Sequence, residues 1–352
     1  MAQFKPSWLL YGASGYSGAL IAEAAKARGL EPILAGRSAA TLAPLAEKLG
    51  LKYRIFSLDD RSGTDKGLMG IKLVLNCAGP FNTTAVPLAQ ACIRNSVHYL
   101  DLAGEVHPIR GLQRIEERAL EEQVMLMPGV GFSVLLSEAL LAHIKARRPG
   151  VVRAKMAYVV DGGASRGTVQ TLLESLAMPG YTRDRDQLVL IAPAANKLDV
   201  DFASGGKRTC VTNPWRGDLY TCGISLGLKN LECYTAFPWY ALDLFRKPAL
   251  SAEQGTLGKA VRWFAKKLPI GPSPGQRAKN RCFIWAEGVD EDGRKAGGLI
   301  VGGDAYDVSA QCALYAVEQV LGGSFRAGFT PPALLFGSEP LNALKSIKFT
   351  AF

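Results

Sequence analysis

The first 130 residues alternate between short apolar runs and segments whose apolar positions have helical spacing. The predicted strands cover residues 8–10, 32–38, 53–56, 71–77, 97–102 and 124–129, and the predicted helices cover 19–29, 39–49, 83–95 and 109–123. The run 71–77 is almost wholly apolar, which is typical of a strand buried on both faces. Strands that alternate with helices in this way predict a parallel, doubly wound α/β sheet of the Rossmann type.

The alternation breaks after about residue 130. Residues 153–160 alternate with period two, residues 168–177 have helical spacing, and residues 211–235 and 281–289 are strand-like. Residues 306–321 form an amphipathic helix that ends at Gly322. We therefore expect a first domain over 1–129 and a second, α+β domain with a mainly antiparallel sheet over 130–303. We expect residues 304–352 to pack back on the first domain.

A glycine-rich segment joins the first predicted strand to the first predicted helix. Its glycines allow a tight turn, a close approach to a pyrophosphate and close packing of the helix on the sheet. The helix start then presents backbone N–H groups to the phosphates. A strand before and a helix after are the context in which this spacing indicates dinucleotide binding, although a turn that binds nothing is the alternative. The predicted cofactor contacts here are Gly12, Ser14, Gly15, Tyr16, Ser17 and Gly18.

The end of the second predicted strand bears on which dinucleotide is bound. NAD sites carry an acidic residue there, which accepts hydrogen bonds from the ribose hydroxyls. This chain has Arg37 followed by Ser38 at that position. A guanidinium matches a 2′-phosphate by a bidentate, charge-assisted contact, whereas the alternative is an ordinary surface arginine. The sequence therefore favours NADP(H), with Arg37 and Ser38 as contacts.

Five segments follow predicted strands, and ligands of such sheets bind outside the carboxyl ends of the strands. The segments are residues 12–18, Arg37, residues 77–81, residues 101–105 and residues 129–132. We expect them to line one crevice. In the third segment, Ala78, Gly79, Pro80 and Phe81 complete the predicted cofactor contacts.

Length and composition predict a folded protein of two domains. The chain has 352 residues, of which 48% are hydrophobic and 20% charged. Its formal charge is +10, and the densest basic stretch runs from Lys259 to Arg281. That stretch could attract an anionic substrate or a membrane surface, or simply be a solvated face. No nucleic-acid-binding module is present in the sequence, so a nucleic-acid partner is not expected.

The cysteines and the start of the chain bear on its compartment. Seven cysteines stand at wide spacings without a Cys-x-x-Cys pair, which predicts reduced thiols rather than disulfides or a zinc site. The start, residues 1–6, leads straight into a strand, so we expect no signal peptide. No apolar run is long enough to span a bilayer. Three histidines without clustered partners argue against a catalytic metal. We expect a cytoplasmic protein.

Several of these motifs together resemble the saccharopine dehydrogenase-like oxidoreductases. They are the glycine turn 12–18, Gly36-Arg37, Asn76-Cys-Ala-Gly-Pro-Phe81, Ala91-Cys92 and His98-Tyr-Leu-Asp-Leu-Ala-Gly-Glu105. The short bacterial branch that includes trans-acting enoyl reductases is the most similar part of the family. Weaker landmarks continue the resemblance at 164–168, 271–274, 302–306 and 328–332. One departure is the segment after Phe132, where Ser133-Val134 replaces the aspartate and proline that relatives often have.

The resemblance implies an NADP(H)-dependent hydride transfer but no particular substrate. Saccharopine reductases act on imines derived from amino acids, and the enoyl reductases act on apolar chains. Apart from Arg37, no arginines gather at the strand ends, so we expect a largely apolar small-molecule substrate with a C=C or C=N bond. Two aromatic-rich segments, 237–245 and 261–265, could wall its pocket or rest on lipid as a peripheral contact, or be core or dimer packing.

The residue that would supply a proton is not evident from the sequence. Weak candidates are Asp101, Glu105 and His107, and Asp101 also reads as a residue that holds a loop. Tyr16 lies inside the glycine turn and is more readily explained by packing. If solvent protonates the product, no side-chain acid is needed.

Other enzyme classes are disfavoured. No tyrosine is followed four residues later by a lysine, so the catalytic pair of short-chain dehydrogenases is missing. Val130 follows Pro128-Gly129 where N-acetyl-glutamyl-phosphate reductases carry their cysteine nucleophile. A protein that binds NADP without turnover is the second hypothesis. We also expect a homodimer formed through residues of roughly 150–300, because an open sheet edge or apolar face is costly in water.

Overall fold

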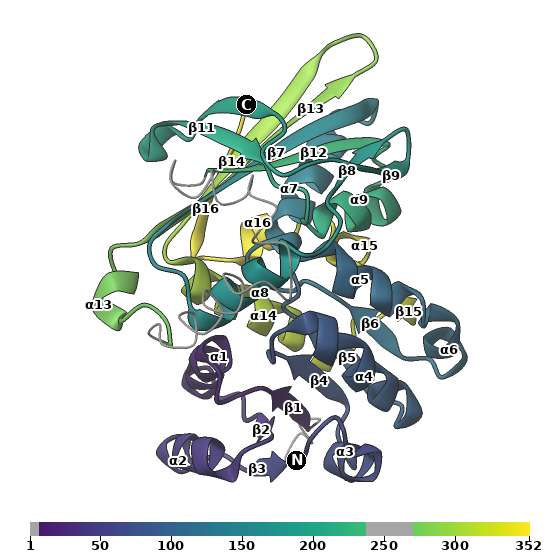
Figure 1. The fold of residues 1–352 in the computed structure, drawn as a ribbon, viewed down its shortest axis with the longest axis vertical. Helices are drawn as coiled ribbons and strands as arrows, with labels where there is room; N and C mark the ends of the chain where they lie inside the picture. The colour runs from purple at the N-terminus through teal and green to yellow at the C-terminus, as the bar shows by residue number, and fades with distance from the viewer. Residues whose placement is uncertain (1–6, 237–269) are drawn as a thin grey trace. The chain divides into compact units, whose positions relative to one another are not determined.

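The computed structural model describes residues 7–236 and 270–352 (Figure 1). They form two compact units. The first comprises the residues up to Ala103, His107–Leu135 and Tyr306–Leu335, and the second comprises Gly104–Val106, Leu136–Ala305 and Phe336–Phe352. The start of the chain (1–6), the aromatic-rich segments 237–245 and 261–265, and the part of the basic stretch before residue 270 lie outside the described residues.

The first unit contains a seven-stranded parallel sheet. Its strands are β1 (Trp8–Tyr11), β2 (Ile33–Gly36), β3 (Tyr53–Ile55), β4 (Leu73–Asn76), β5 (His98–Asp101), β6 (Met125–Met127) and β15 (Gly328–Phe329). The spatial order is β15-β6-β5-β4-β1-β2-β3, and each pair of neighbouring strands is parallel. The order reverses direction between β1 and β4, which is the switch point of a Rossmann sheet. The predicted doubly wound fold is confirmed.

The helices of this unit follow the strands in alternation. They are α1 (Tyr16–Ala27), α2 (Ala39–Leu49), α3 (Arg61–Leu68), α4 (Phe81–Arg94), α5 (Val106–Gln113), α6 (Glu116–Glu121) and α14 (Ala305–Leu321). The single helix expected over 109–123 is wrong, because α5 and α6 are separate. Helix α3 was not predicted, since it contains two glycines. One of them, Gly67, is needed because a Cβ there would lie 2.4 Å from the Phe56 ring.

The second unit contains a mixed sheet of nine strands. They are β7 (Val151–Asp161), β8 (Tyr181–Asp184), β9 (Gln187–Leu190), β10 (Lys197–Asp201), β11 (Lys207–Thr212), β12 (Asn230–Thr235), β13 (Arg281–Asp290), β14 (Lys295–Gly302) and β16 (Ile347–Ala351). The main order is β10-β11-β12-β7-β13-β14-β16, and β8 joins β12 to β9. Among the described strands of this second sheet, only β7 and β12 pair in parallel. A mainly antiparallel second sheet is therefore confirmed.

Shorter helices and an apolar core complete the second unit. Its helices include α7 (Val134–Arg147), α8 (Arg166–Ser175), α9 (Asp218–Leu226), α13 (Pro274–Arg277) and α16 (Pro340–Ala343), and α15 (Pro332–Phe336) ends the tail of the first unit. On one face of the sheet, Phe202 and Phe283 pack with ring centroids 6.0 Å apart. Tyr234 and Val159 belong to the same buried cluster, which ties β10, β12, β7 and β13 together.

The tail of the chain does not follow the expected limits. Residues 304–352 were expected to pack on the first domain, but only the part up to Leu335 belongs to that unit. Strand β16 instead pairs with β14 in the second sheet, with Ile300 opposite Phe349. The two-residue strand β15 pairs with β6 and adds a seventh strand to the first sheet. Pairing partners so distant along the chain leave no trace in local periodicity.

Candidate functional site

The glycine turn is built by close backbone packing at the switch point. Gly12 has φ +78°, and its N–H donates to the Ala35 carbonyl oxygen at 2.8 Å. A Cβ on Gly12 would lie 2.6 Å from the backbone nitrogen of Ala78, so only glycine allows the loops after β1 and β4 to meet. A Cβ on Gly18 would lie 2.4 Å from the Gly12 carbonyl oxygen. The first and third glycines therefore serve packing inside the protein.

The second glycine has a different environment. Gly15 is exposed, and a Cβ there would have only the Gly12 carbonyl oxygen within 4 Å, at 3.2 Å. Gly15 is also the N-cap of α1, where no side chain makes a capping hydrogen bond and no acidic residue stands in the first turn. A helix start of this kind favours an anion, because the backbone N–H groups and the helix dipole both point toward it. The turn fits a pyrophosphate on its outer side.

A second helix start lies beside this turn. Ser38 is the N-cap of α2 and makes no side-chain capping bond, and the first turn of α2 contains no acidic residue. The Thr41 hydroxyl lies within hydrogen-bond distance of Ser14 Oγ, at 3.3 Å, and of the Ser38 carbonyl oxygen, at 3.2 Å, which ties α2 to the glycine turn. Arg37 is exposed and forms no ion pair within the described residues. This group of cationic and hydroxyl side chains fits a 2′-phosphate, and Thr41 is a member that sequence reasoning missed.

The loop after β4 is shaped by Asn76. The Ala78 N–H donates to Asn76 Oδ1 at 3.0 Å, and the Thr84 hydroxyl donates to the Ala78 carbonyl oxygen at 2.5 Å. Pro80 is the N-cap of α4 and Phe81 its first residue, while Gly79 is exposed with open space where a Cβ would stand. The structure thus brings the loop that holds Ala78–Phe81 against Gly12, as the predicted crevice requires.

A buried polar chain runs behind these loops. Asn76 Nδ2 donates to the Tyr99 hydroxyl at 3.0 Å, and that hydroxyl donates to Asp101 Oδ2 at 2.9 Å. Asp101 Oδ1 accepts the N–H groups of Ala103 and Gly129, both at 2.9 Å. The chain therefore links the carboxyl ends of β4, β5 and β6 and fixes the loops that follow β5 and β6.

The electrostatics of Asp101 follow from its burial. Its side chain is fully buried and faces only neutral donors, so burial raises the pKa of the carboxyl to about 6, while its hydrogen bonds lower it. Burial, with the nearby Asp101 charge, also raises the pKa of Tyr99 well above its usual value. Asp101 has the contacts of a residue that holds loops.

Glu105 and His107, the other two candidate proton donors, lie on the segment after β5. Both side chains are partly buried. Glu105 Oε2 accepts the N–H of Gly104 at 3.1 Å, and the backbone of Glu105 forms an isolated antiparallel bridge with Arg216. His107 stands in the first turn of α5.

The amino-terminal turn of α14 adds residues that the sequence did not assign. The ring of Tyr306 meets the ring of Tyr16 edge-on, with centroids 4.9 Å apart and planes at 89°. Ser309 Oγ accepts the N–H of Phe132 at 3.1 Å. One signal was available, because Tyr306 closes one of the weak family landmarks. Helix α14 therefore packs beside the glycine turn and the loop after β6, all within the first unit.

The second unit holds a buried ionic cluster that nothing in the sequence indicated. Arg216 Nε and Nη2 donate to Asp218 Oδ2 at 3.0 and 2.8 Å, and the Ser137 hydroxyl donates to Asp218 Oδ1. The guanidinium carbon of Arg216 lies 4.4 Å from the centroid of the Tyr158 ring. The Asp218 side chain is wholly buried. Burial alone would lower the pKa of Arg216, but the negative charge of Asp218 outweighs it and raises that pKa above its usual value. The charge of Arg216 is thus neutralised by Asp218.

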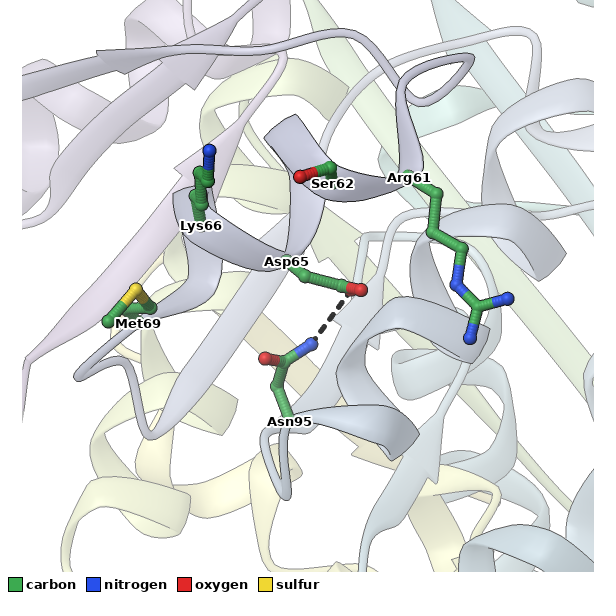
Figure 2. A pocket seen from close by; sticks show the side chains of 6 residues that line it. All are labelled: Arg61, Ser62, Asp65, Lys66, Met69 and Asn95. Atoms are coloured by element: carbon green, nitrogen blue, oxygen red, sulfur yellow. Dashed lines mark hydrogen bonds between the residues drawn. The ribbon is translucent and has the colours of Figure 1, made fainter.

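One surface hollow of the first unit lies away from the glycine turn (Figure 2). It has a volume of about 530 Å³ and is lined by Arg61, Ser62, Asp65, Lys66, Met69 and Asn95. These residues belong to α3 and to the turn before the amino end of β5. Asp65 is paired with Arg94 Nη2 at 2.8 Å and accepts from Asn95 at 3.0 Å, which lowers its pKa. The hollow contains none of the predicted site residues.

The described residues include no group of three or more His, Cys, Asp or Glu side chains placed to hold a metal ion. No helix among them is both long and apolar enough to cross a membrane.

Comparison with known proteins agrees with this geometry. Residues 8–126 match the family model of the saccharopine dehydrogenase NADP binding domain. These residues are therefore similar to a saccharopine dehydrogenase-type NADP-binding domain. The match covers β1 to β6 and includes the glycine turn and Arg37, and it confirms the predicted resemblance and NADP(H) as the predicted cofactor.

Whole-protein relatives carry the same family names. The human saccharopine dehydrogenase-like oxidoreductase is 24% identical over 179 residues, which are 45% of this chain and 42% of the relative. A Mycobacterium tuberculosis relative named as a trans-acting enoyl reductase is 30% identical over 184 residues, 48% of this chain and 44% of the relative. The chain therefore matches less than half the length of these relatives.

A solved structure shares the fold across nearly the whole chain. It is apo saccharopine dehydrogenase (L-Glu forming) from Saccharomyces cerevisiae, with TM-score 0.69 and 12% identity over 99% of this chain and 100% of that one. The saccharopine dehydrogenase-like fold thus extends through the second unit, beyond the residues that the family model matches.

Proposed function

We propose that this chain is an NADP(H)-dependent oxidoreductase that reduces a C=C or C=N bond of a largely apolar small molecule by hydride transfer. The observation that carries the proposal is the pairing of two uncapped helix starts, at Gly15 and Ser38, with the exposed Arg37 between them. Three anionic groups of NADP, its two bridging phosphates and its 2′-phosphate, need such donors.

The predicted contact residues divide by the part of the cofactor they would hold. Gly15, Tyr16 and Ser17 start α1 and would bind the pyrophosphate. Arg37 and Ser38 would bind the 2′-phosphate, with Ser14 and Thr41 beside them. Ala78–Phe81 would border the nicotinamide side, since they follow β4 at the switch point. When bound, NADPH supplies a hydride from its nicotinamide ring.

The roles of the polar residues follow from their hydrogen bonds. Asp101 is a positioning residue, because its oxygens accept from Ala103, Gly129 and Tyr99. Glu105 or His107 would supply the proton if a side chain does so, and solvent would supply it otherwise. Neither role requires a metal ion.

The preference for an apolar substrate rests on charge. A multiply carboxylated imine needs unpaired cations to offset its charges. Arg37 is assigned to the cofactor, and the charge of Arg216 is already neutralised by Asp218. We therefore propose enoyl compounds or cyclic imines rather than saccharopine as substrates.

A substrate panel tests the proposal. NADPH oxidation is followed with enoyl thioesters, with cyclic imines, and with the lysine-derived aldehyde plus glutamate, each also with NADH. Turnover of an enoyl or imine substrate with NADPH supports the proposal. Saccharopine formation or cleavage would replace the substrate class by that of the amino-acid imine reductases. Tight NADPH binding without turnover of any compound would favour the non-catalytic NADP-binding alternative.

A further inference from the structure

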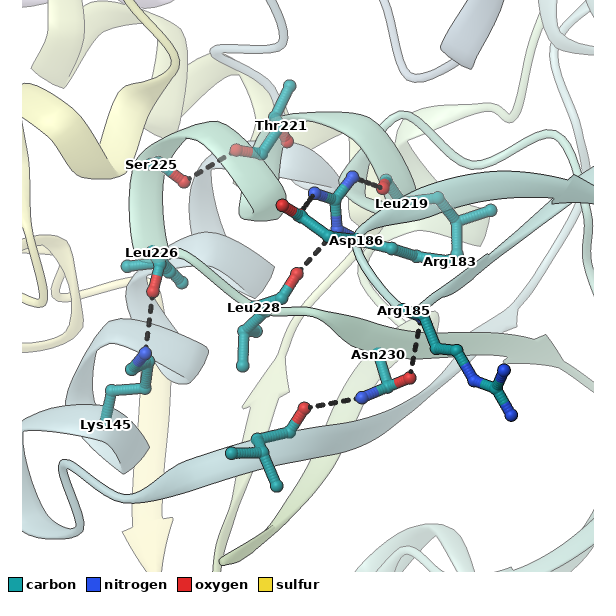
Figure 3. A network of polar contacts seen from close by, with 11 residues as sticks. Lys145, Arg183, Arg185, Asp186, Leu219, Thr221, Ser225, Leu226, Leu228 and Asn230 are labelled. Atoms are coloured by element: carbon teal, nitrogen blue, oxygen red, sulfur yellow. Dashed lines mark hydrogen bonds and ion pairs between the residues drawn. The ribbon is translucent and has the colours of Figure 1, made fainter.

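The hairpin of β8 and β9 is held rigidly against the second unit (Figure 3). Its two-residue turn uses Arg185 and Asp186, both with positive φ, at +46° and +69°. Such a turn usually takes Asn-Gly, so the two residues carry a conformational cost. The Arg185 N–H donates to Asn230 Oδ1 at 3.0 Å, and the Asp186 N–H donates to the Lys229 carbonyl oxygen at 2.8 Å. These contacts fix the turn.

A buried arginine also holds this hairpin in place. Arg183 on β8 donates to the carbonyl oxygens of Leu228 (2.5 Å) and Leu219 (3.5 Å) and pairs with Asp186 (Figure 3). Its guanidinium lies across Gly223 of α9, where a Cβ would come within 2.0 Å of Arg183 Cζ. The outer strand β9 is therefore presented in a fixed position rather than on a loose loop.

The outer edge of β9 is apolar and open to solvent. Val189 is 43% exposed and Leu190 72%, and Gln187–Ile191 contains no charge. Among the described strands, β9 pairs only with β8. The register places Val189 opposite Thr182, and the Ile191 N–H donates to the Gly180 carbonyl oxygen at 3.0 Å. Because the backbone groups of successive residues in a strand point to alternate sides, the N–H and C=O groups of Leu188 and Leu190 point away from β8.

The other described sheet edges are protected in the usual ways. Strands β3 and β15 have only three and two residues, β10 alternates Lys197, Asp199 and Asp201 with apolar residues, and β16 carries Lys348. Charges and short length are the devices that keep sheet edges from pairing. Strand β9 has neither charge nor cover among the described residues, although an apolar edge is costly to expose.

The edge is complementary to itself. An antiparallel two-fold axis through Val189 would pair Leu188 of each copy with Leu190 of the other, and their outward N–H and C=O groups would bond. The turn charges at 184–186 would then lie opposite 192–194, Ala-Pro-Ala, so no like charges meet. We propose that β9 pairs with β9 of a second copy of this chain and joins the two sheets into one.

The size of the contact sets the expected strength. Pairing of about five residues per copy falls below the ~1,200 Å² of a standard stable interface, so the dimer should be weak and concentration-dependent. Light scattering of the full chain from about 1 to about 200 µM should show the mass rising from one chain toward two. A single-chain mass over the whole range would overturn the proposal.

Substitutions at the axis test the register. Val189→Lys and Val189→Glu each place two like charges opposite each other, which destabilises a cross-strand pair. Each variant alone should be a monomer at concentrations where the unaltered chain dimerises, and an equimolar mixture should dimerise again. Dimers in both single variants, or a mixture that stays monomeric, would overturn the proposal.

Two controls separate pairing from damage to the fold. Met69→Lys alters another exposed apolar residue, in the first unit and 67% exposed, and should leave dimerisation unchanged. Val189→Cys keeps the strand apolar and should form an intermolecular disulfide under mild oxidation, because directly opposed residues of this type approach to about 4.5 Å between Cα atoms. Leu190→Cys should cross-link far less. Equal cross-linking of the two would overturn the assigned axis.

Discussion

The glycine turn of the first unit and the Arg216–Asp218 cluster of the second are both polar, but the turn lies at the surface and the cluster is buried. In the turn, Gly15 begins a helix that no side chain caps. In the cluster, Asp218 accepts from Arg216 and Ser137 and is fully buried. The first arrangement leaves donors for a ligand, and the second is closed on itself. Polarity alone therefore does not mark a binding site, whereas a helix start at the surface that no side chain caps does.

The glycine turn can be tested at a single residue. Gly15→Val should weaken NADPH binding more than about 1,000-fold, or about 4 kcal/mol, since the added side chain occupies the place of the pyrophosphate. The protein should stay folded, because only the Gly12 carbonyl oxygen lies near a Cβ at 15. NADPH fluorescence titration beside thermal unfolding measures both. Full binding in a folded variant would show that the turn is not the site.

A matched variant uses the neighbouring glycine. Gly12→Ala should lower the free energy of unfolding by about 2–4 kcal/mol, through its positive φ and the contact of its Cβ with the loop after β4. The smaller side chain should thus do more harm to folding than valine at Gly15. Equal stability losses for the two variants would contradict the division of roles between the glycines.

Substitutions in the Arg216–Asp218 cluster should change the free energy of unfolding rather than NADPH binding. Arg216→Met leaves Asp218 as an unpaired buried carboxylate and should cost about 3–5 kcal/mol in the free energy of unfolding. The double variant Arg216→Met with Asp218→Leu should recover much of this, because no charge is then left without its partner. Urea unfolding measures both. A double variant no more stable than the single one would show that the ion pair itself carries the stability.

Arg37 offers the next test, at the open site. Arg37→Asp should weaken NADPH binding by about 3–4 kcal/mol, since a charge-assisted contact is lost and a repulsion is added. NADH binding should change far less, because NADH has no 2′-phosphate. Arg61→Asp changes another exposed arginine of the same unit and serves as the control. Equal losses for NADPH and NADH would remove Arg37 from the 2′-phosphate site.

Local sequence signals predicted the first unit well. Three glycines after a strand, and an arginine where NAD sites carry an acid, are features within a few neighbouring residues, so the turn, the sheet and the cofactor could be read from them. The approach of Ala78 to Gly12 fits the expectation that segments after the strands of a parallel sheet share one edge, while the contact of Ala78 with the cofactor stays a prediction.

The sequence could not predict contacts between distant segments. Tyr306 meets Tyr16 from the far end of the chain, and Ser137 donates to Asp218 from a helix that lies much earlier in the chain. Strand β16 joins the second sheet although nothing in its five residues specifies a partner. The exposed edge of β9 was equally invisible, because its apolar run resembles that of any buried strand. Whether a strand is buried, and which strand it pairs with, depend on the whole fold and not on the residues of the strand alone.

The smallest expected effect concerns Asp101, a buried carboxylate that faces neutral donors where Asp218 faces a cation. Its pKa rises from 3.8 in the unfolded chain to about 6 in the folded one, so the folded state binds more protons between these values. Stability from this group is therefore present at low pH and is lost as the pH rises toward 6. A shift of about two units corresponds to at most about 3 kcal/mol. Asp101→Asn cannot ionise and should remove this loss, seen as a flatter dependence of the free energy of unfolding on pH between about 4 and 7.

Asp65, a partly buried aspartate of the same unit, supplies a control of opposite sign. Arg94 lowers the pKa of Asp65, so the stability from Asp65 is present at neutral pH and is lost as the pH falls. Asp65→Asn should therefore remove the loss of stability that occurs as the pH falls, whereas Asp101→Asn should remove the loss that occurs as the pH rises toward 6. Urea unfolding of both variants across the pH range separates the two contributions. If Asp101→Asn keeps the pH dependence of the unaltered chain, Asp101 is not the group that burial perturbs.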